Sequence, residues 1–62
     1  MTREEMEFLI YATKKSLHGV DTALSQAKFD HEEELAEHLD GVRKTLNQAI
    51  AGLQAASKYV KG

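Results

Sequence analysis

The sequence contains no cysteine, so neither a disulfide nor a thiolate metal site can stabilise the fold. The sequence also has no apolar run that approaches the length of a membrane span, roughly 18 residues. The first residues, Met1 to Glu5, also lack the apolar core of a signal peptide. We therefore expect a soluble cytoplasmic protein without a membrane partner. With only 62 residues, it forms one small domain whose remaining means of completing a core is a partner subunit.

Charge of one sign and catalytic patterns are scarce as well. The chain has 8 Lys and Arg against 10 Asp and Glu, a net charge of -2, which is a poor balance for a general phosphate-backbone binder. It has no Gly-x-Ser-x-Gly elbow, no phosphate-binding glycine loop and no His-Glu-x-x-His pattern. We expect no enzymatic activity and no cofactor.

The histidines suggest a metal site only weakly. His31, Glu34 and His38 share one face of the expected second helix, but the two histidines are seven residues apart. Their separation is about 10 Å along a helix axis, too far to share one ion. We expect no metal, and we interpret the acidic cluster from Asp30 to Asp40 as a solvated helix start that complements the helix dipole.

A first helix is predicted over residues 2–27. Thr2 and Glu5 have the spacing of a capping box, in which each side chain satisfies the other residue's backbone N–H. Gly19 disfavours a helix by about 1 kcal/mol relative to alanine. The stripe that faces the core nevertheless keeps its alternating spacing of four and three residues through this glycine, at Met6, Ile10, Thr13, Leu17, Val20, Leu24 and Ala27.

A second helix is predicted over residues 31–61, after a tight turn at residues 28–30. Asp30 and Glu33 repeat the capping-box spacing, which makes Asp30 the expected N-cap. The expected core stripe of this helix consists of Leu35, Leu39, Val42, Leu46, Ala49, Leu53, Ala56 and Val60. The predicted fold is thus all-α: residues 1–62 form a single antiparallel helical hairpin.

Small residues beside these stripes favour close approach of a further helix. They are Ala12, Ser16, Gly19, Ala23, Gly41, Gly52 and Ala55. We expect the hairpin to dimerise with itself into a four-helix bundle. Three alternatives remain open: a helical bundle with another protein, in which this chain is a subunit or a chaperone; a monomer; and small residues that merely face solvent.

A second stripe on the first helix lies off the expected core and combines aromatic and basic side chains: Phe8, Tyr11, Lys14, Lys15 and His18. Exposed aromatic residues beside cations are typical of protein-binding patches. The alternative is that Phe8 and Tyr11 complete the bundle core, against Tyr59 of the opposing helix end. A nucleic-acid interface is a further alternative.

The layout resembles that of the Rop plasmid copy-number proteins, which are capped hairpins that dimerise into an antiparallel four-helix bundle and bind an RNA pair on one face. No residue motif is shared. The resemblance implies an RNA face at Phe8, Lys14, Lys15 and His18, which the acidic neighbours Glu4, Glu7 and Asp21 weaken.

The size, the absence of cysteine and the hairpin layout also resemble the short helical accessory proteins of temperate lambda-like phages. Such proteins are non-enzymatic and act on host physiology through protein contacts. The resemblance implies a phage or mobile-element protein, located in the cytoplasm of a bacterial host, that modulates a host factor. Our working hypothesis is therefore a non-enzymatic helical homodimer that binds another protein.

Overall fold

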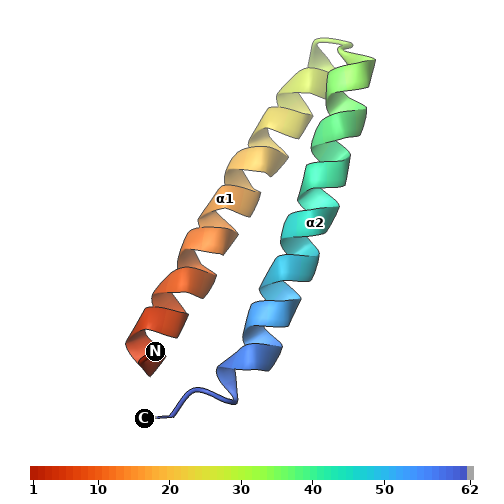
Figure 1. The fold of residues 1–62 in the computed structure, drawn as a ribbon. Coiled ribbons are helices and arrows are strands. Elements are labelled where there is room, and N and C mark those ends of the chain that lie inside the picture. The colour runs from red at the N-terminus through yellow and green to blue at the C-terminus, as the bar shows by residue number, and fades with distance from the viewer. Residues whose placement is uncertain (62) are drawn as a thin grey trace.

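The computed structural model describes residues 1–61 and consists of two helices packed side by side in an antiparallel hairpin (Figure 1). Helix α1 spans Arg3–Phe29 and helix α2 spans Glu33–Ser57. The hairpin is long and thin, with extents of 48 × 14 × 10 Å, and its two termini lie at the end opposite the turn (Figure 1). The prediction of an all-helical fold with two helices is confirmed.

Helix α1 begins where the capping box predicts. The backbone N–H of Glu5 donates to Thr2 Oγ1 (3.1 Å), and the backbone N–H of Thr2 donates to Glu5 Oε1 (2.7 Å). The helix then runs without interruption through Gly19. The expected continuous first helix is confirmed, although it extends two residues beyond the predicted end, to Phe29.

The turn differs from the prediction. Asp30 is the C-cap of α1, and its carboxylate accepts two hydrogen bonds from Gln26 Nε2, both of 3.1 Å. The N-cap of α2 is Glu32, which makes no capping hydrogen bond through its side chain. The prediction that Asp30 caps the second helix is therefore wrong. The same acidic residue suits either helix end at a turn, and here its carboxylate bonds backwards, to α1.

A left-handed residue closes α1. His31 has φ = 60°, and the N–H of Glu32 donates to the carbonyl of Ala27 (2.9 Å) while the N–H of His31 donates to that of Lys28 (3.1 Å). This pair of bonds is a Schellman motif, which satisfies carbonyls left free at a helix end. The turn consequently lies at residues 30–32, and α2 covers 33–57 rather than 31–61.

The contact between the helices uses the predicted stripe of α1. Met6, Leu24 and Ala27 are buried. The other members are half-buried: Ile10, Thr13, Leu17 and Val20. This stripe is thus the face that α1 presents to α2, with its alternating spacing of four and three intact.

On α2 the observed contact residues differ from the predicted stripe: at every second position the contact residue is the one that follows the predicted residue. Ile50 is buried, although the predicted stripe omits it, whereas Leu35 and Val42 remain 48% and 45% exposed. Ala49 and Ala56 of the predicted stripe are exposed as well. These four residues therefore lie outside the contact with α1, which corrects their assignment. The buried or half-buried residues at this spacing in α2 are Ala36, Leu39, Arg43, Leu46, Ile50, Leu53 and Ser57, which we call its contact residues; Val60, beyond the end of the helix, is half-buried as well.

The reason for the shift is that α2 has an apolar surface wider than one stripe. Leu39, Leu46 and Leu53 belong to both the predicted and the observed sets. On one side of them lie Leu35 and Val42, and on the other side lies Ile50. A single neighbouring helix covers only one of these two sides, so part of the apolar surface of α2 stays uncovered in the hairpin.

Candidate interaction surfaces

The aromatic and basic stripe of α1 lies outside the contact with α2. Phe8 is 69% exposed and Tyr11 is 57% exposed, and the three basic members, Lys14, Lys15 and His18, are exposed as well. Phe8 stands two residues from the contact residues on either side of it, which in a helix is the opposite face. Phe8 and Tyr11 therefore do not fill the contact between α1 and α2, and the alternative that they complete the core of a four-helix bundle stays a prediction. Tyr59, the suggested partner of both, is also exposed.

A cation–π contact joins two members of this stripe. Lys15 Nζ lies 5.6 Å from the centroid of the Tyr11 ring, one helical turn away. At an exposed position such a contact contributes about 0.5–1 kcal/mol. A second one, between Lys58 and Tyr59 at 5.3 Å, follows the end of α2. The chain thus carries a Lys–Tyr pair within the stripe and another outside it, which makes the second pair a natural experimental control.

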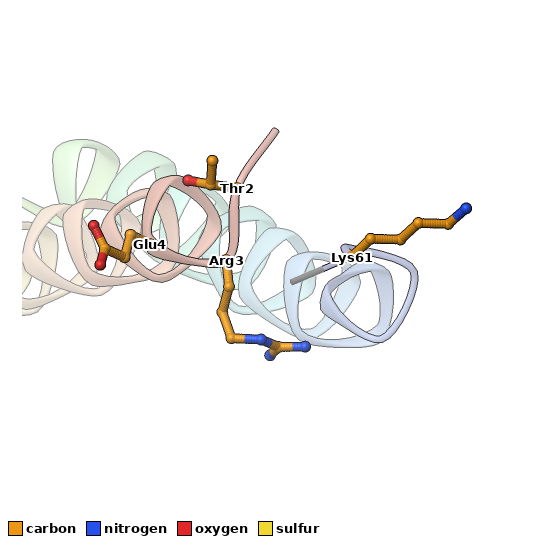
Figure 2. Close-up of a pocket in the computed structure, with 4 residues that line it drawn as sticks. All are labelled: Thr2, Arg3, Glu4 and Lys61. Carbon is orange, nitrogen blue, oxygen red and sulfur yellow. The ribbon is translucent and has the colours of Figure 1, made fainter.

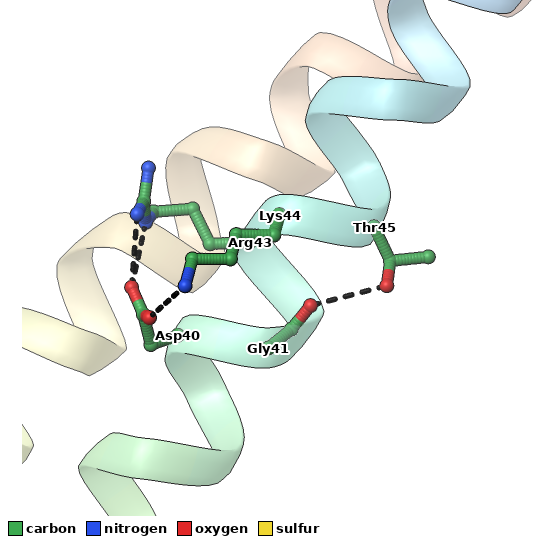
Figure 3. A network of polar contacts seen from close by, with 5 residues as sticks. All are labelled: Asp40, Gly41, Arg43, Lys44 and Thr45. Carbon is green, nitrogen blue, oxygen red and sulfur yellow. Dashed lines mark hydrogen bonds and ion pairs between the residues drawn. The ribbon is translucent and has the colours of Figure 1, made fainter.

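The acidic cluster at the start of α2 includes an ion-pair network (Figure 3). Asp40 Oδ1 accepts from the Arg43 guanidinium at 2.9 Å and 3.2 Å, and Lys44 Nζ lies 3.2 Å from Asp40 Oδ2. The hydrogen bonds from Arg43, and then that from Lys44, lower the pKa of Asp40. All three residues belong to one helix, so the network stabilises α2 locally.

The glycines among the small residues have open space beside them in the hairpin, so the predicted approach of a further helix is not tested by the contact between α1 and α2. A Cβ atom added at Gly19, Gly41 or Gly52 would meet no atom within 4 Å among the described residues. Gly41 and Ala55 each lie two residues from contact residues on both sides, hence on the back of α2. The small residues of α1, Ala12, Ser16, Gly19 and Ala23, instead flank the contact on a single side.

One open hollow lies at the free end of the hairpin and is lined by Thr2, Arg3, Glu4 and Lys61 (Figure 2). The side chains of Arg3, Glu4 and Lys61 point away from one another there. Among residues 1–61, no group of three or more His, Asp or Glu side chains is placed to hold a metal ion. Within the same residues, neither helix is long and apolar enough to cross a membrane.

Sequence reasoning missed one feature of this surface, the apolar side of α2 that α1 leaves uncovered. The available signal was that Ile50 follows Leu46 by four residues while Ala49 follows it by three, so two adjacent stripes are apolar at once.

Comparisons of the chain with protein-family models, with curated proteins and with solved structures gave no match. The proposals below accordingly depend on the residues of this chain alone.

Proposed function

We propose that this protein is a non-enzymatic helical homodimer that binds another protein through the aromatic and basic stripe of α1. The observation that carries the proposal is the exposure of Phe8 and Tyr11, 69% and 57%, on a helix face that the hairpin does not use for packing. Exposed aromatic side chains are the commonest energetic anchors of protein interfaces. The resemblance to phage accessory proteins suggests a host factor as the partner.

The charges of the stripe indicate the kind of surface that it fits. Lys14, Lys15 and His18 belong to the same stripe as the two rings, and Lys15 lies over the ring of Tyr11, while the chain as a whole has a net charge of -2. The matching partner surface has an apolar pocket for the rings and acidic groups at its edge, because such complementarity raises the rate and the specificity of association.

Capture experiments with matched variants test this proposal. We expect Tyr11→Ala and Phe8→Ala to abolish retention of the partner from a lysate of the host. The controls are Tyr59→Ala and Phe29→Ala, which remove exposed aromatic rings outside the stripe, the first of them from an equivalent Lys–Tyr pair. Retention that survives in the stripe variants, or that is lost equally in the controls, contradicts the proposal.

A nucleic-acid interface is the second candidate, favoured by the presence of three basic side chains and two exposed rings in one stripe. It predicts that RNA or DNA binding falls steeply with salt and that Lys14→Ala and Lys15→Ala each reduce the salt dependence. Binding of a protein partner that survives nuclease treatment and varies little with salt supports the first candidate against this one.

A further inference from the structure

One broad side of the hairpin is uncharged. From residue 9 in α1 and residue 35 in α2, six exposed apolar residues immediately precede contact residues: Leu9, Ala23, Leu35, Val42, Ala49 and Ala56. The same side also carries Ala12, Ser16, Gly19, Gln26, His38, Thr45 and Gly52, and we call it the uncharged face. The three largest of the six apolar side chains, Leu9, Leu35 and Val42, are 38%, 48% and 45% exposed. These side chains make an apolar surface that one chain by itself does not cover.

The six residues lie on the same side of the hairpin although they come from both helices. An antiparallel helix pair has an approximate two-fold axis perpendicular to the plane of the two helices. Positions that are equivalent relative to the contact therefore emerge on the same side. Since each of the six precedes a contact residue by one position, α1 and α2 contribute to one continuous surface.

Charge is segregated between the two sides. From 9 to 26 in α1 and from 35 to 56 in α2, no residue that precedes a contact residue is Asp, Glu, Lys or Arg. Residues that follow contact residues include Lys14 and Asp21 in α1 and Asp40 and Lys44 in α2. Water-facing sides of helices normally carry mixed charges. An uncharged side over most of the length of both helices indicates a surface that is covered.

The accessible surface of the hairpin is larger than that of a compact monomer of the same mass. The hairpin exposes 4801 Å². A compact monomer of 6.9 kDa exposes about 4,000 Å², so the hairpin exposes about 800 Å² in excess. A standard protein interface buries about 800 Å² on each partner. The excess surface is thus comparable in size to what one partner contributes to a standard interface.

We propose that a second copy of this chain covers the uncharged face, so that two hairpins complete one four-helix bundle. Bulky and small residues occupy opposite diagonals of this face. The bulky residues are Leu9, near the free end of α1, and Leu35 and Val42, toward the turn in α2. The small residues are Ala23, near the turn in α1, and Ala56, near the free end of α2. A two-fold rotation that brings the face onto its copy lays bulky corners on small ones, with neighbouring helices antiparallel.

This inference deepens the dimer named in the proposed function and leaves the aromatic stripe free. Tyr11, Lys14 and His18 each follow a contact residue, and Phe8 and Lys15 lie on the back of α1. A dimer built through the uncharged face therefore presents two copies of the stripe to a partner. The two proposals can be contradicted independently. The mass of the protein tests the dimer, and capture of a partner tests the aromatic and basic stripe.

The first test uses two identical substitutions on α2. Ala49→Glu introduces a charge in the uncharged face, whereas Ala51→Glu introduces it on the charged side, and both alanines are exposed in the hairpin. By light scattering, we expect the unmodified chain and the Ala51→Glu variant to have twice the 6.9 kDa mass of one chain. The Ala49→Glu variant should have the mass of a single chain, because the dimer would bury an unpaired charge. An Ala49→Glu variant with the mass of the unmodified dimer overturns the proposal. An unmodified chain that stays at 6.9 kDa overturns it too, and assigns the face to a helix of another protein.

A second test leaves the fold intact and introduces no charge. Because the chain has no cysteine, Ser16→Cys and Ser25→Cys each carry one thiol. Ser16 precedes the contact residue Leu17, on the side of the uncharged face, and Ser25 follows Leu24; both serines are exposed in the hairpin. We expect a neutral alkylating reagent to modify Ser16→Cys at least tenfold more slowly than Ser25→Cys at high protein concentration, and equally upon dilution. Equal rates at all concentrations, with helical content unchanged, contradict the proposal.

Discussion

The backbone N–H of Glu32 donates a hydrogen bond of 2.9 Å to the carbonyl oxygen of Ala27, and the chain reverses direction across this bond. His31, between them, adopts φ = 60° to make it possible. The turn therefore depends on a residue in the left-handed conformation. At this position after a helix the left-handed residue is usually glycine, but here it is a histidine.

Substitution of His31 tests this account of the turn. The left-handed region costs a non-glycine residue about 1–2 kcal/mol, so we expect His31→Gly to raise the free energy of unfolding by about 0.5–1 kcal/mol. His31→Val lowers it, because a β-branched side chain tolerates this conformation poorly. Urea denaturation measures both. The matched control is His38→Gly inside α2, where the poorer helix propensity of glycine lowers stability by a few tenths of a kcal/mol. A destabilised His31→Gly variant contradicts the account.

Ile50 tests the observed phase of α2. It is 8% exposed, so Ile50→Ala removes buried methylene groups and should lower the free energy of unfolding by about 2–5 kcal/mol. Gln48→Ala, at an exposed position two residues earlier in the same helix, should change it by less than about 0.5 kcal/mol. Equal effects of the two substitutions would show that Ile50 is not part of the contact with α1.

Gly41 offers a stabilising substitution. It lies inside α2, and a Cβ atom there meets nothing within 4 Å in the part of the chain that is described. We therefore expect Gly41→Ala to raise the free energy of unfolding by about 0.5–1 kcal/mol through the better helix propensity of alanine. Light scattering should give an unchanged mass, since Gly41 lies on the back of α2. A loss of mass or of stability would place a partner helix against this glycine.

The pH dependence of stability follows from two carboxylates. The backbone and side chain of Thr2 lower the pKa of Glu5, and Arg43 and Lys44 lower that of Asp40. A carboxylate with a lowered pKa in the folded state stabilises the fold above its unfolded pKa and loses this contribution as the pH falls through its folded pKa. We expect stability to decline below about pH 4, the range in which both groups titrate in unfolded chains.

Two isosteric variants check this assignment. Glu5→Gln and Asp40→Asn retain a side-chain oxygen but do not titrate, so each should flatten the acid limb of a plot of unfolding free energy against pH. The double variant should flatten it further, because the two sites lie on different helices and do not interact. Curves that coincide with that of the unmodified chain would refute the role of these two groups.

The degree to which the sequence predicts the fold differs between the two helices. The start of α1 is predictable, because the capping box has one interpretation. Its contact stripe is predictable too, because the spacing of its apolar residues fits only one helix face. At the turn Asp30 can close the first helix or cap the second, and local patterns do not decide between these roles. The phase of α2 is equally ambiguous, because Leu35 and Val42 on one side and Ile50 on the other fit the same three leucines.

The candidate surfaces follow the same division. The exposure of Phe8 and Tyr11 is predictable, because both lie off a stripe that has one phase. The uncharged face emerges only once the contact residues of α2 are known, since it consists of the residues that precede them. Binding of a protein partner to the stripe, and of a second copy to the uncharged face, remain predictions that solution experiments decide.

The central claim is that two copies of the hairpin complete one core. The most direct measurement is urea denaturation, followed by helical content, over about a hundredfold range of protein concentration. We predict that the midpoint rises with concentration, because unfolding then includes the separation of two chains, and that Ala49→Glu abolishes this rise while Ala51→Glu retains it. A midpoint of the unmodified chain that is independent of concentration would contradict the claim.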